Sequence, residues 1–270
     1  MAVGICSLTG KLGTYVRSHM IPLAFTKATG GEYFVEGRPG VRPFRRHTSW
    51  YDPKLVTRDG EDVLADLDSR AAVELRAMRL VWSSWEENEK PLVWAVAEND
   101  TETRYRLIEG HDYKLLRRFF ISLLWRAAAS NMKEYTHVRL SSQSLERTKS
   151  IVLGAGDDDA LFFPVQLVQL STRGPRHNMG PIRMTMPFRG SDLRADLVSY
   201  RFYFDGLIVN YFLNVPPDLL ADTKALYVGA TDSLQVVGIP YEASFQRANM
   251  DSHQKEAWEN FPSDIKKLLR

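Results

Sequence analysis

Cysteine is nearly absent from this sequence, since Cys6 is the only one in 270 residues. A single thiol excludes an intramolecular disulfide framework and any zinc site built from several thiolates of one chain. Long apolar runs are also missing, and no stretch approaches the roughly 20 residues that a membrane-spanning helix needs. The amino-terminal residues lack the charged segment and apolar stretch of a secretory signal. These absences predict a soluble cytoplasmic protein with no membrane partner.

The net charge is small as well, because 35 Lys and Arg stand against 33 Asp and Glu, which leaves a formal charge of +2. So small an excess does not by itself indicate a nucleic-acid partner, and a basic surface has to come from local clustering. Apolar residues make up 44% of the chain, which at this length is ample for a large hydrophobic core.

Two segments carry the first chemical signal. The first runs from the turn Cys6-Ser7-Leu8-Thr9-Gly10 to Ser18-His19-Met20-Ile21-Pro22. The second runs from Asp52 through an apolar pair to Thr57-Arg58-Asp59-Gly60-Glu61. In order and spacing they resemble HNH (His-Me finger, ββα-metal) endonucleases of the Ser-His-x-Ile-Pro type, in which two Cys-x-x-Cys knuckles hold a structural zinc.

The zinc ligands that this family would have are mostly replaced. Cys6 is kept, whereas Thr9, Thr57 and Gly60 stand at the other three knuckle positions. Threonine and glycine side chains cannot replace thiolates, so no structural zinc is expected. The resemblance then predicts a zinc-less module that is held by packing against the rest of the chain.

The resemblance also implies a catalytic site. His19 falls at the position of the general base that activates water. Asp52 and Glu61 fall where ligands would hold a divalent cation, and carboxylate oxygens suit Mg²⁺ or Mn²⁺. Ser18 stands where many relatives carry an acidic ligand, so the set is incomplete, and His47 is a spare imidazole. The structural alternatives are a turn-stabilising histidine, a turn aspartate and a first-turn helix acid.

Basic residues gather in two places, a loop rich in proline and aromatic residues between 32 and 50 and the start of a long apolar helix. A phosphate-contacting surface would consist of Arg38, Arg42, Arg45, Arg46, His47, Lys114, Arg117 and Arg118. The alternative for the loop is a solvated charged segment. The three helix residues extend the surface only if the start of the helix lies beside the loop.

Hydrophobic periodicity predicts helices from Gly60 to Trp82, from Tyr113 to Ala128 and from Leu145 to Leu153, with a polar helical tail from His253. The second of these is apolar around most of its surface, which predicts a buried central helix. Its Trp125 and Arg126 are expected in the core, the arginine in a buried pair. A short helix is expected from Pro22 to Thr29.

Strands are expected in seven places: 91–96, 103–108, 163–170, 182–188, 200–204, 207–215 and 234–239. Asp205-Gly206 between two of them is typical of a tight hairpin turn. The predicted fold is α+β, with a small zinc-less HNH-like ββα module (residues 1–88) fused to a larger α+β body with an antiparallel sheet (residues 89–270).

Two functions follow from the resemblance. The first is an HNH-derived nucleic-acid-binding protein, for DNA rather than RNA, with residual metal-dependent phosphodiester cleavage. The second is a catalytically inactive scaffold that serves as an adaptor, an inhibitor or a subunit of a protein complex. For the second, the acidic loop 157–159 and the polar tail are the candidate protein-binding surfaces, and a bacterial or phage origin with a role in phage defence or counter-defence is implied. Carboxylates around His19 would favour the enzyme, and apolar packing would favour the scaffold.

Overall fold

The computed structural model describes residues 2–27, 33–38, 41–85, 92–97, 100–156, 158–189 and 194–269. Its helices are α1 (Leu23–Thr26), α2 (Arg58–Ala77), α3 (Tyr113–Ala129), α4 (Ser142–Leu153), α5 (Pro217–Asp222), α6 (Phe245–Asn260) and α7 (Pro262–Leu268). Its strands are β1 (Val3–Ile5), β2 (Leu12–Thr14), β3 (Ser18–His19), β4 (Phe34–Arg38), β5 (Val41–Arg46), β6 (Tyr51–Asp52), β7 (Ala95–Ala97), β8 (Asp100–Glu109), β9 (Val165–Leu170), β10 (Met179–Arg189), β11 (Arg194–Phe204), β12 (Leu207–Phe212) and β13 (Ser233–Ile239). None of the helices within these ranges is long and apolar enough to cross a membrane.

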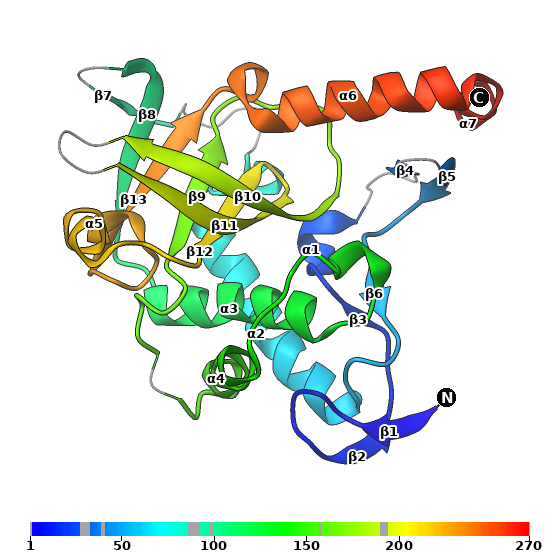
Figure 1. The fold of residues 1–270 in the computed structure, drawn as a ribbon, viewed down its shortest axis with the longest axis horizontal. Coiled ribbons are helices and arrows are strands. Elements are labelled where there is room, and N and C mark those ends of the chain that lie inside the picture. Colours follow the sequence, from blue (N-terminus) through cyan, green and yellow to red (C-terminus); the bar gives the residue numbers. More distant parts are fainter. Residues whose placement is uncertain are drawn as a thin grey trace.

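A seven-stranded sheet forms the body of the protein, in the order β10-β11-β12-β9-β13-β8-β7 (Figure 1). Only the β13–β9 pair is parallel, and the other neighbouring strands are antiparallel. The α+β class and the antiparallel sheet of the body are therefore confirmed. The predicted tight turn joins β11 to β12, where Asp205 and Gly206 both have positive φ, 47° and 80°.

The sheet is covered on both faces, and β12 shows this most directly. Every residue of β12 is buried, although side chains of a strand alternate between its two faces. Leu207, Val209 and Tyr211 belong to the main hydrophobic cluster with α2 and α3, whereas Ile208 and Phe212 belong to two smaller clusters. A strand that is covered on both faces has no solvent-facing side, which explains why five of its six residues are apolar or aromatic. The sixth, Asn210, is buried and donates to Gln166 Oε1 at 3.3 Å.

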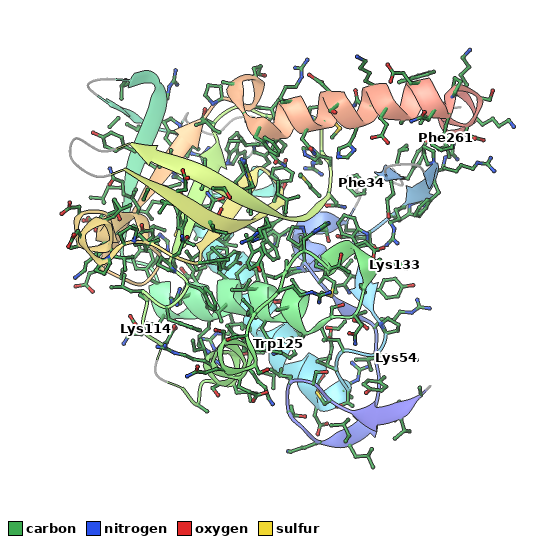
Figure 2. All side chains as sticks on the ribbon, in the orientation of Figure 1. Phe34, Lys54, Lys114, Trp125, Lys133 and Phe261 are labelled. Atoms are coloured by element: carbon green, nitrogen blue, oxygen red, sulfur yellow. The ribbon has the colours of Figure 1, made fainter. Side chains whose placement is uncertain are left out.

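Helix α3 lies beneath the sheet, between it and α2 and α4 (Figures 1 and 2). It is buried on nearly all sides, and Trp125 near its carboxyl end is 1% exposed. Asp112 caps its amino terminus by accepting the amide hydrogen of Leu115 at 2.9 Å. The predicted central helix is thus confirmed, to within one residue at its carboxyl end.

The amino-terminal segment packs onto this body. β1 and β2 form a short antiparallel hairpin, and β3 pairs with β6 immediately before α2 begins. Residues of this segment, α2 and α3 share one continuous buried cluster. The predicted boundary between residues 88 and 89 lies outside the described residues, and the division into two domains stays a prediction.

Two of the differences from the predicted elements have a local cause. The basic loop between 32 and 50 contains the hairpin β4–β5, whose ladder has a register irregularity between Glu36 and Arg38. Two-residue alternation is obscured there by glycines and prolines, so the sequence did not predict these strands. Helix α2 ends at Ala77 because Arg79 adopts a φ of 54°, and the Leu80 amide then donates back to the Leu75 carbonyl at 2.9 Å.

Candidate functional site around His19

The four knuckle positions converge in the structure around the sulfur of Cys6. The Thr9 amide donates to Cys6 Sγ at 3.4 Å, and hydrogen bonds from Thr57 also act on this thiol. A Cβ atom at Gly60 would lie only 2.5 Å from the same sulfur. Residues that are about 50 positions apart therefore meet at one buried point, where Cys6 is 1% exposed.

This cluster is closed by backbone hydrogen bonds. The Cys6 amide donates to the Lys11 carbonyl at 2.9 Å, and the Ser7 amide donates to the Leu55 carbonyl at 3.0 Å. Burial by itself raises the pKa of Cys6, but the hydrogen bonds from Thr9 and Thr57 outweigh it and bring the pKa below its usual value. Hydrogen bonds and packing thus hold the two turns together at this point.

His19 lies in the β3–β6 ladder next to this cluster. Its Cα pairs across the strands with that of Tyr51, and Ser18 pairs in the same way with Asp52. The His19 carbonyl accepts a hydrogen bond from Arg126 Nη1 of α3 at 3.0 Å. Arg126 also forms a two-pronged ion pair with Asp68 of α2, with distances of 3.0 and 2.6 Å. The expected buried pair at Arg126 is confirmed, and its partner is Asp68.

The electrostatic surroundings favour the neutral form of His19. Burial lowers the pKa of His19, the positive charge of Arg126 lowers it further, and Asp68 acts in the opposite direction. Burial raises the pKa of Glu61, while the Ser18 hydroxyl and Arg126 oppose that rise. A neutral imidazole is the form that can accept a proton from water. The imidazole, two carboxylates and one guanidinium therefore form a single polar cluster.

Asp52 has a structural role in this arrangement. Its Oδ1 accepts the amide hydrogen of Lys54 at 2.8 Å, which closes the turn after β6. Its Oδ2 accepts the hydroxyl hydrogen of Ser130 at 2.7 Å, which fixes the residue that ends α3. Both oxygens are engaged, so the role of Asp52 as a metal ligand stays a prediction that this geometry does not favour.

The donor set fits a divalent cation only in part. Among the described residues, no three His, Cys, Asp or Glu side chains are grouped closely enough to hold a metal ion. Glu61 Oε2 and Ser18 Oγ are buried and have no hydrogen-bonding partner with good geometry there. The guanidinium of Arg126, 1% exposed, already supplies a fixed positive charge to this cluster. The described residues around His19 therefore do not make up a complete set of metal ligands.

Two residues that the sequence did not single out complete the outer face of the ladder. The Arg17 guanidinium lies over the Tyr51 ring, 5.0 Å from its centroid, and the Tyr51 and His19 rings are 6.0 Å apart. Arg17 is exposed, and the other two are half-buried. Two-residue alternation around His19 is the sequence signal for a strand there. Residues that face each other across paired strands are neighbours, and in this ladder the residue opposite His19 is Tyr51.

The basic hairpin is engaged with the carboxyl-terminal helices. Arg42 pairs with Asp264 at 2.6 Å, and Arg45 donates to the Leu268 carbonyl at 2.7 Å. Arg46 pairs with Glu36 inside the hairpin. Arg42 and Arg45 therefore hold α7 against β4–β5, and Figure 1 shows these elements next to each other. His47 is exposed, and the side chain of Arg38 lies outside the described part of the chain.

The basic residues of α3 do not extend this surface. Lys114 lies at the opposite end of the molecule from the hairpin, which Phe34 marks in Figure 2. Arg117 is 1% exposed and donates to Asp158 at 2.9 Å and to the carbonyls of residues 159, 162 and 163. Arg118 donates to the Val152 carbonyl at 2.9 Å. The start of α3 therefore does not lie beside the loop, and nucleic-acid binding by Lys114, Arg117 and Arg118 stays a prediction.

The scaffold alternative uses the acidic loop 157–159 and the polar tail as protein-binding surfaces. The tail contacts the basic hairpin through Asp264 and the Leu268 carbonyl, and the loop also has internal contacts. Asp158 is the partner of Arg117, and Asp159 Oδ1 accepts the amide hydrogen of Leu161 at 2.9 Å. Asp157 lies outside the described residues.

Comparisons of the chain with protein-family models, with curated proteins and with solved structures found no match.

Proposed function

We propose that this chain is an HNH-derived nucleic-acid-binding protein that contacts the phosphodiester backbone at the surface formed by Arg17, His19 and Tyr51. The observation that carries the proposal is the convergence of Cys6, Thr9, Thr57 and Gly60 at one sulfur, where two zinc knuckles would place their ligands. Strands β3 and β6 and helix α2 then follow in the order that a ββα module requires.

The binding surface is supported by its chemistry. An exposed guanidinium stacked on an aromatic ring presents a positive charge at a fixed position, and the ring itself offers a face for an unpaired base. The His19 imidazole beside it adds a hydrogen-bonding group. The arginines of β5 contribute less than the sequence suggests, because Arg42 and Arg45 are already bound to α7.

A second candidate is hydrolysis of the phosphodiester with His19 as the general base. It is favoured by the lowered pKa of His19 and by the buried Glu61 carboxylate, which shares Arg126 and Asp68 with His19 as charged neighbours. Mg²⁺ or Mn²⁺ would be needed to stabilise the developing charge on the phosphate. The engaged oxygens of Asp52 and the fixed charge of Arg126 favour binding without cleavage.

The test combines a gel shift with a nicking assay, using plasmid and single-stranded DNA with Mg²⁺ or Mn²⁺. We expect the wild-type protein to shift DNA, and Arg17→Ala to weaken binding and to reduce the salt slope by about 1. Arg70→Ala, which removes an exposed guanidinium of α2, is the matched control.

The variant His19→Ala tests separately whether cleavage depends on His19. His137→Ala, which changes an exposed histidine, is its control. Nicking that only His19→Ala abolishes would establish the second candidate. A protein that neither shifts nor cleaves any DNA or RNA would refute both, and the inactive scaffold for a protein complex would then be the function to test.

A further inference from the structure

Two adjoining cavities meet at Phe34 of β4 and the segment 176–178. The larger lies between the β4–β5 hairpin, the segment 175–180 and helices α6 and α7, and the smaller lies beside α1, the end of α2 and the turn at Trp82 and Ser83. Their volumes are about 550 and 320 Å³, and both are lined by Phe34, Arg176, His177 and Asn178. Volumes of this order suit small-molecule ligands. His19, Glu61 and Asp68 line neither cavity, so this is a different place from the site around His19.

The smaller cavity is rich in positive charge. Lys27, Arg76 and Arg176 line it, and all three side chains are exposed. Among the described residues of its lining, the one carboxylate is that of Asp205, which is 9% exposed and accepts the amide hydrogen of Ser83 at 3.1 Å. Three cations against one anion favour a ligand group with several negatively charged oxygens, and guanidinium groups match the geometry of phosphate.

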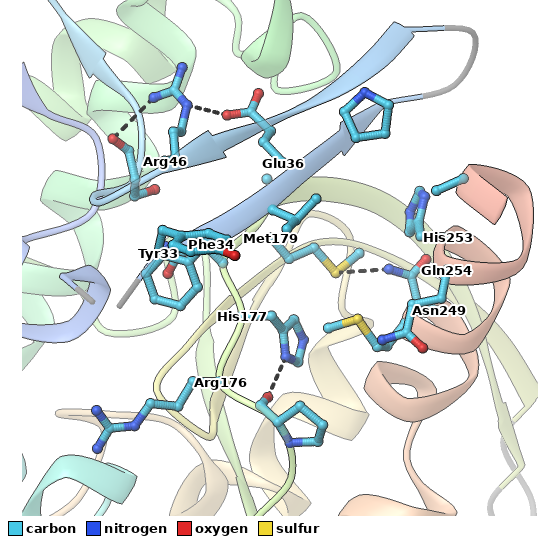
Figure 3. A pocket seen from close by; sticks show the side chains of 18 of the residues that line it. Tyr33, Phe34, Glu36, Arg46, Arg176, His177, Met179, Asn249, His253 and Gln254 are labelled. Carbon is cyan, nitrogen blue, oxygen red and sulfur yellow. Dashed lines mark hydrogen bonds and ion pairs between the residues drawn. The ribbon is translucent and has the colours of Figure 1, made fainter. Parts of the chain in front are cut away.

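The larger cavity has a different lining. Figure 3 shows Tyr33 and Phe34 of the hairpin side facing Asn249 and Gln254 of α6, with His177 between them. Aromatic faces stack on heteroaromatic bases, and carboxamides both donate and accept, as the edge of a base requires. The lining therefore suits a flat, polar ring.

Two buried polar groups in the larger cavity lack partners. Trp50 is 8% exposed and Ser49 is 1% exposed, and both line the cavity. Within the described residues, neither Trp50 Nε1 nor Ser49 Oγ makes a hydrogen bond. Buried donors of this kind are normally satisfied, and leaving one unpaired costs about 1–3 kcal/mol. The acceptor atoms of a bound ligand would satisfy them.

We propose that the two cavities together bind a nucleoside phosphate, with the base in the larger cavity and the phosphate in the smaller one beside Lys27, Arg76 and Arg176. The ligand is either a free mononucleotide or a nucleotide of a single strand, since both present the same base and phosphate.

The test is isothermal titration calorimetry of the full chain with the four 5′-ribonucleoside monophosphates, with adenosine and with inorganic phosphate. We expect at least one mononucleotide to bind at least about tenfold more tightly than adenosine or phosphate alone. Arg76→Ala should weaken that binding about tenfold, as expected for one lost phosphate contact. Arg70→Ala on the same helix should leave it unchanged. Asn249→Ala should reduce the preference among bases.

Several outcomes would overturn the proposal. The first is that the folded protein binds no mononucleotide. The second is that it binds inorganic phosphate as tightly as a mononucleotide, and the third is that Arg76→Ala binds with wild-type affinity. Because Arg76 also donates to the Ala24 carbonyl at 3.2 Å, Lys27→Ala is the second variant if Arg76→Ala does not fold. Displacement of the mononucleotide by a short single-stranded oligonucleotide would assign the ligand to a strand, and no displacement would assign it to free nucleotides.

Discussion

Arg126 of α3 and Asp68 of α2 form a buried two-pronged ion pair, and the same guanidinium donates to the carbonyl of His19 at 3.0 Å. Their side chains are 1% and 18% exposed. One arginine thus joins the central helix, the helix that follows the ladder and the strand that carries the candidate base. The position of His19 therefore depends on the Arg126–Asp68 ion pair. Neither residue of that pair is His19 itself or one of the four knuckle positions.

We expect Asp68→Ala to lower the free energy of unfolding by about 3 kcal/mol, because it leaves the buried Arg126 charge without its partner. Urea denaturation measures this change. Asp66→Ala is the control: its carboxylate is 70% exposed and 3.7 Å from Arg70, so we expect a change below about 0.5 kcal/mol. The double variant Asp68→Leu with Arg126→Met should recover most of the loss, since neither charge of the pair is left without its partner. Equal effects of Asp68→Ala and Asp66→Ala would contradict this account of the pair.

Gly60→Ala places a Cβ atom 2.5 Å from Cys6 Sγ. We expect this overlap to cost roughly 1–3 kcal/mol of stability, although alanine is the better helix former. In a Cys6→Ala background the sulfur is gone, so the same substitution should cost clearly less. The two changes should therefore be non-additive in thermal or urea unfolding. Strict additivity would show that position 60 does not contact the sulfur.

The convergence of the knuckle positions also predicts that a zinc site can be restored. The triple variant Thr9→Cys, Thr57→Cys and Gly60→Cys should bind about one Zn²⁺ per chain together with Cys6, after the Cys6 side chain turns to make room. Cobalt substitution and its visible absorption spectrum provide the measurement. Adding Cys6→Ser to the triple variant should weaken the metal binding strongly. If the triple variant stays folded and binds no Zn²⁺ or Co²⁺, the four positions do not correspond to zinc ligands.

We expect the free energy of unfolding to depend on pH through His177. Burial lowers its pKa, while its hydrogen bond to the Pro175 carbonyl, 2.9 Å long, opposes the shift. Its pKa is near 6.5 in the unfolded chain, so at pH values just below 6.5 the unfolded state binds more protons than the folded state. The stabilisation is therefore fully present above about pH 6.5 and is lost as the pH falls through the lower pKa of the folded state. His19 contributes in the same direction.

His177→Gln should flatten this dependence, which urea unfolding between about pH 5 and 8 measures as the slope of the unfolding free energy against pH. His137→Ala serves as the control because that side chain is exposed. An unchanged slope in His177→Gln would assign the pH dependence to other groups.

Local sequence determined most of the secondary structure, because periodicity and turn chemistry act over a few residues. The apolar surface of α3, the Asp205-Gly206 hairpin and the left-handed Gly154 that ends α4 follow from the identity of adjacent side chains. The order and spacing of the two knuckle segments could likewise be read along the chain. The β4–β5 hairpin could not, because glycine and proline interrupt the alternation that identifies strands.

Only the tertiary structure decided which charged groups meet. Asp68 and Arg126 are 58 residues apart, and Arg45 reaches a carbonyl 223 residues further along the chain. A sequence shows that such a side chain is charged, but its partner depends on which segments the hydrophobic core brings together. For that reason Arg42 and Arg45, which the sequence assigned to phosphate contacts, hold α7 in place, and Arg117 holds the loop after α4, while Arg17 and Tyr51 flank His19.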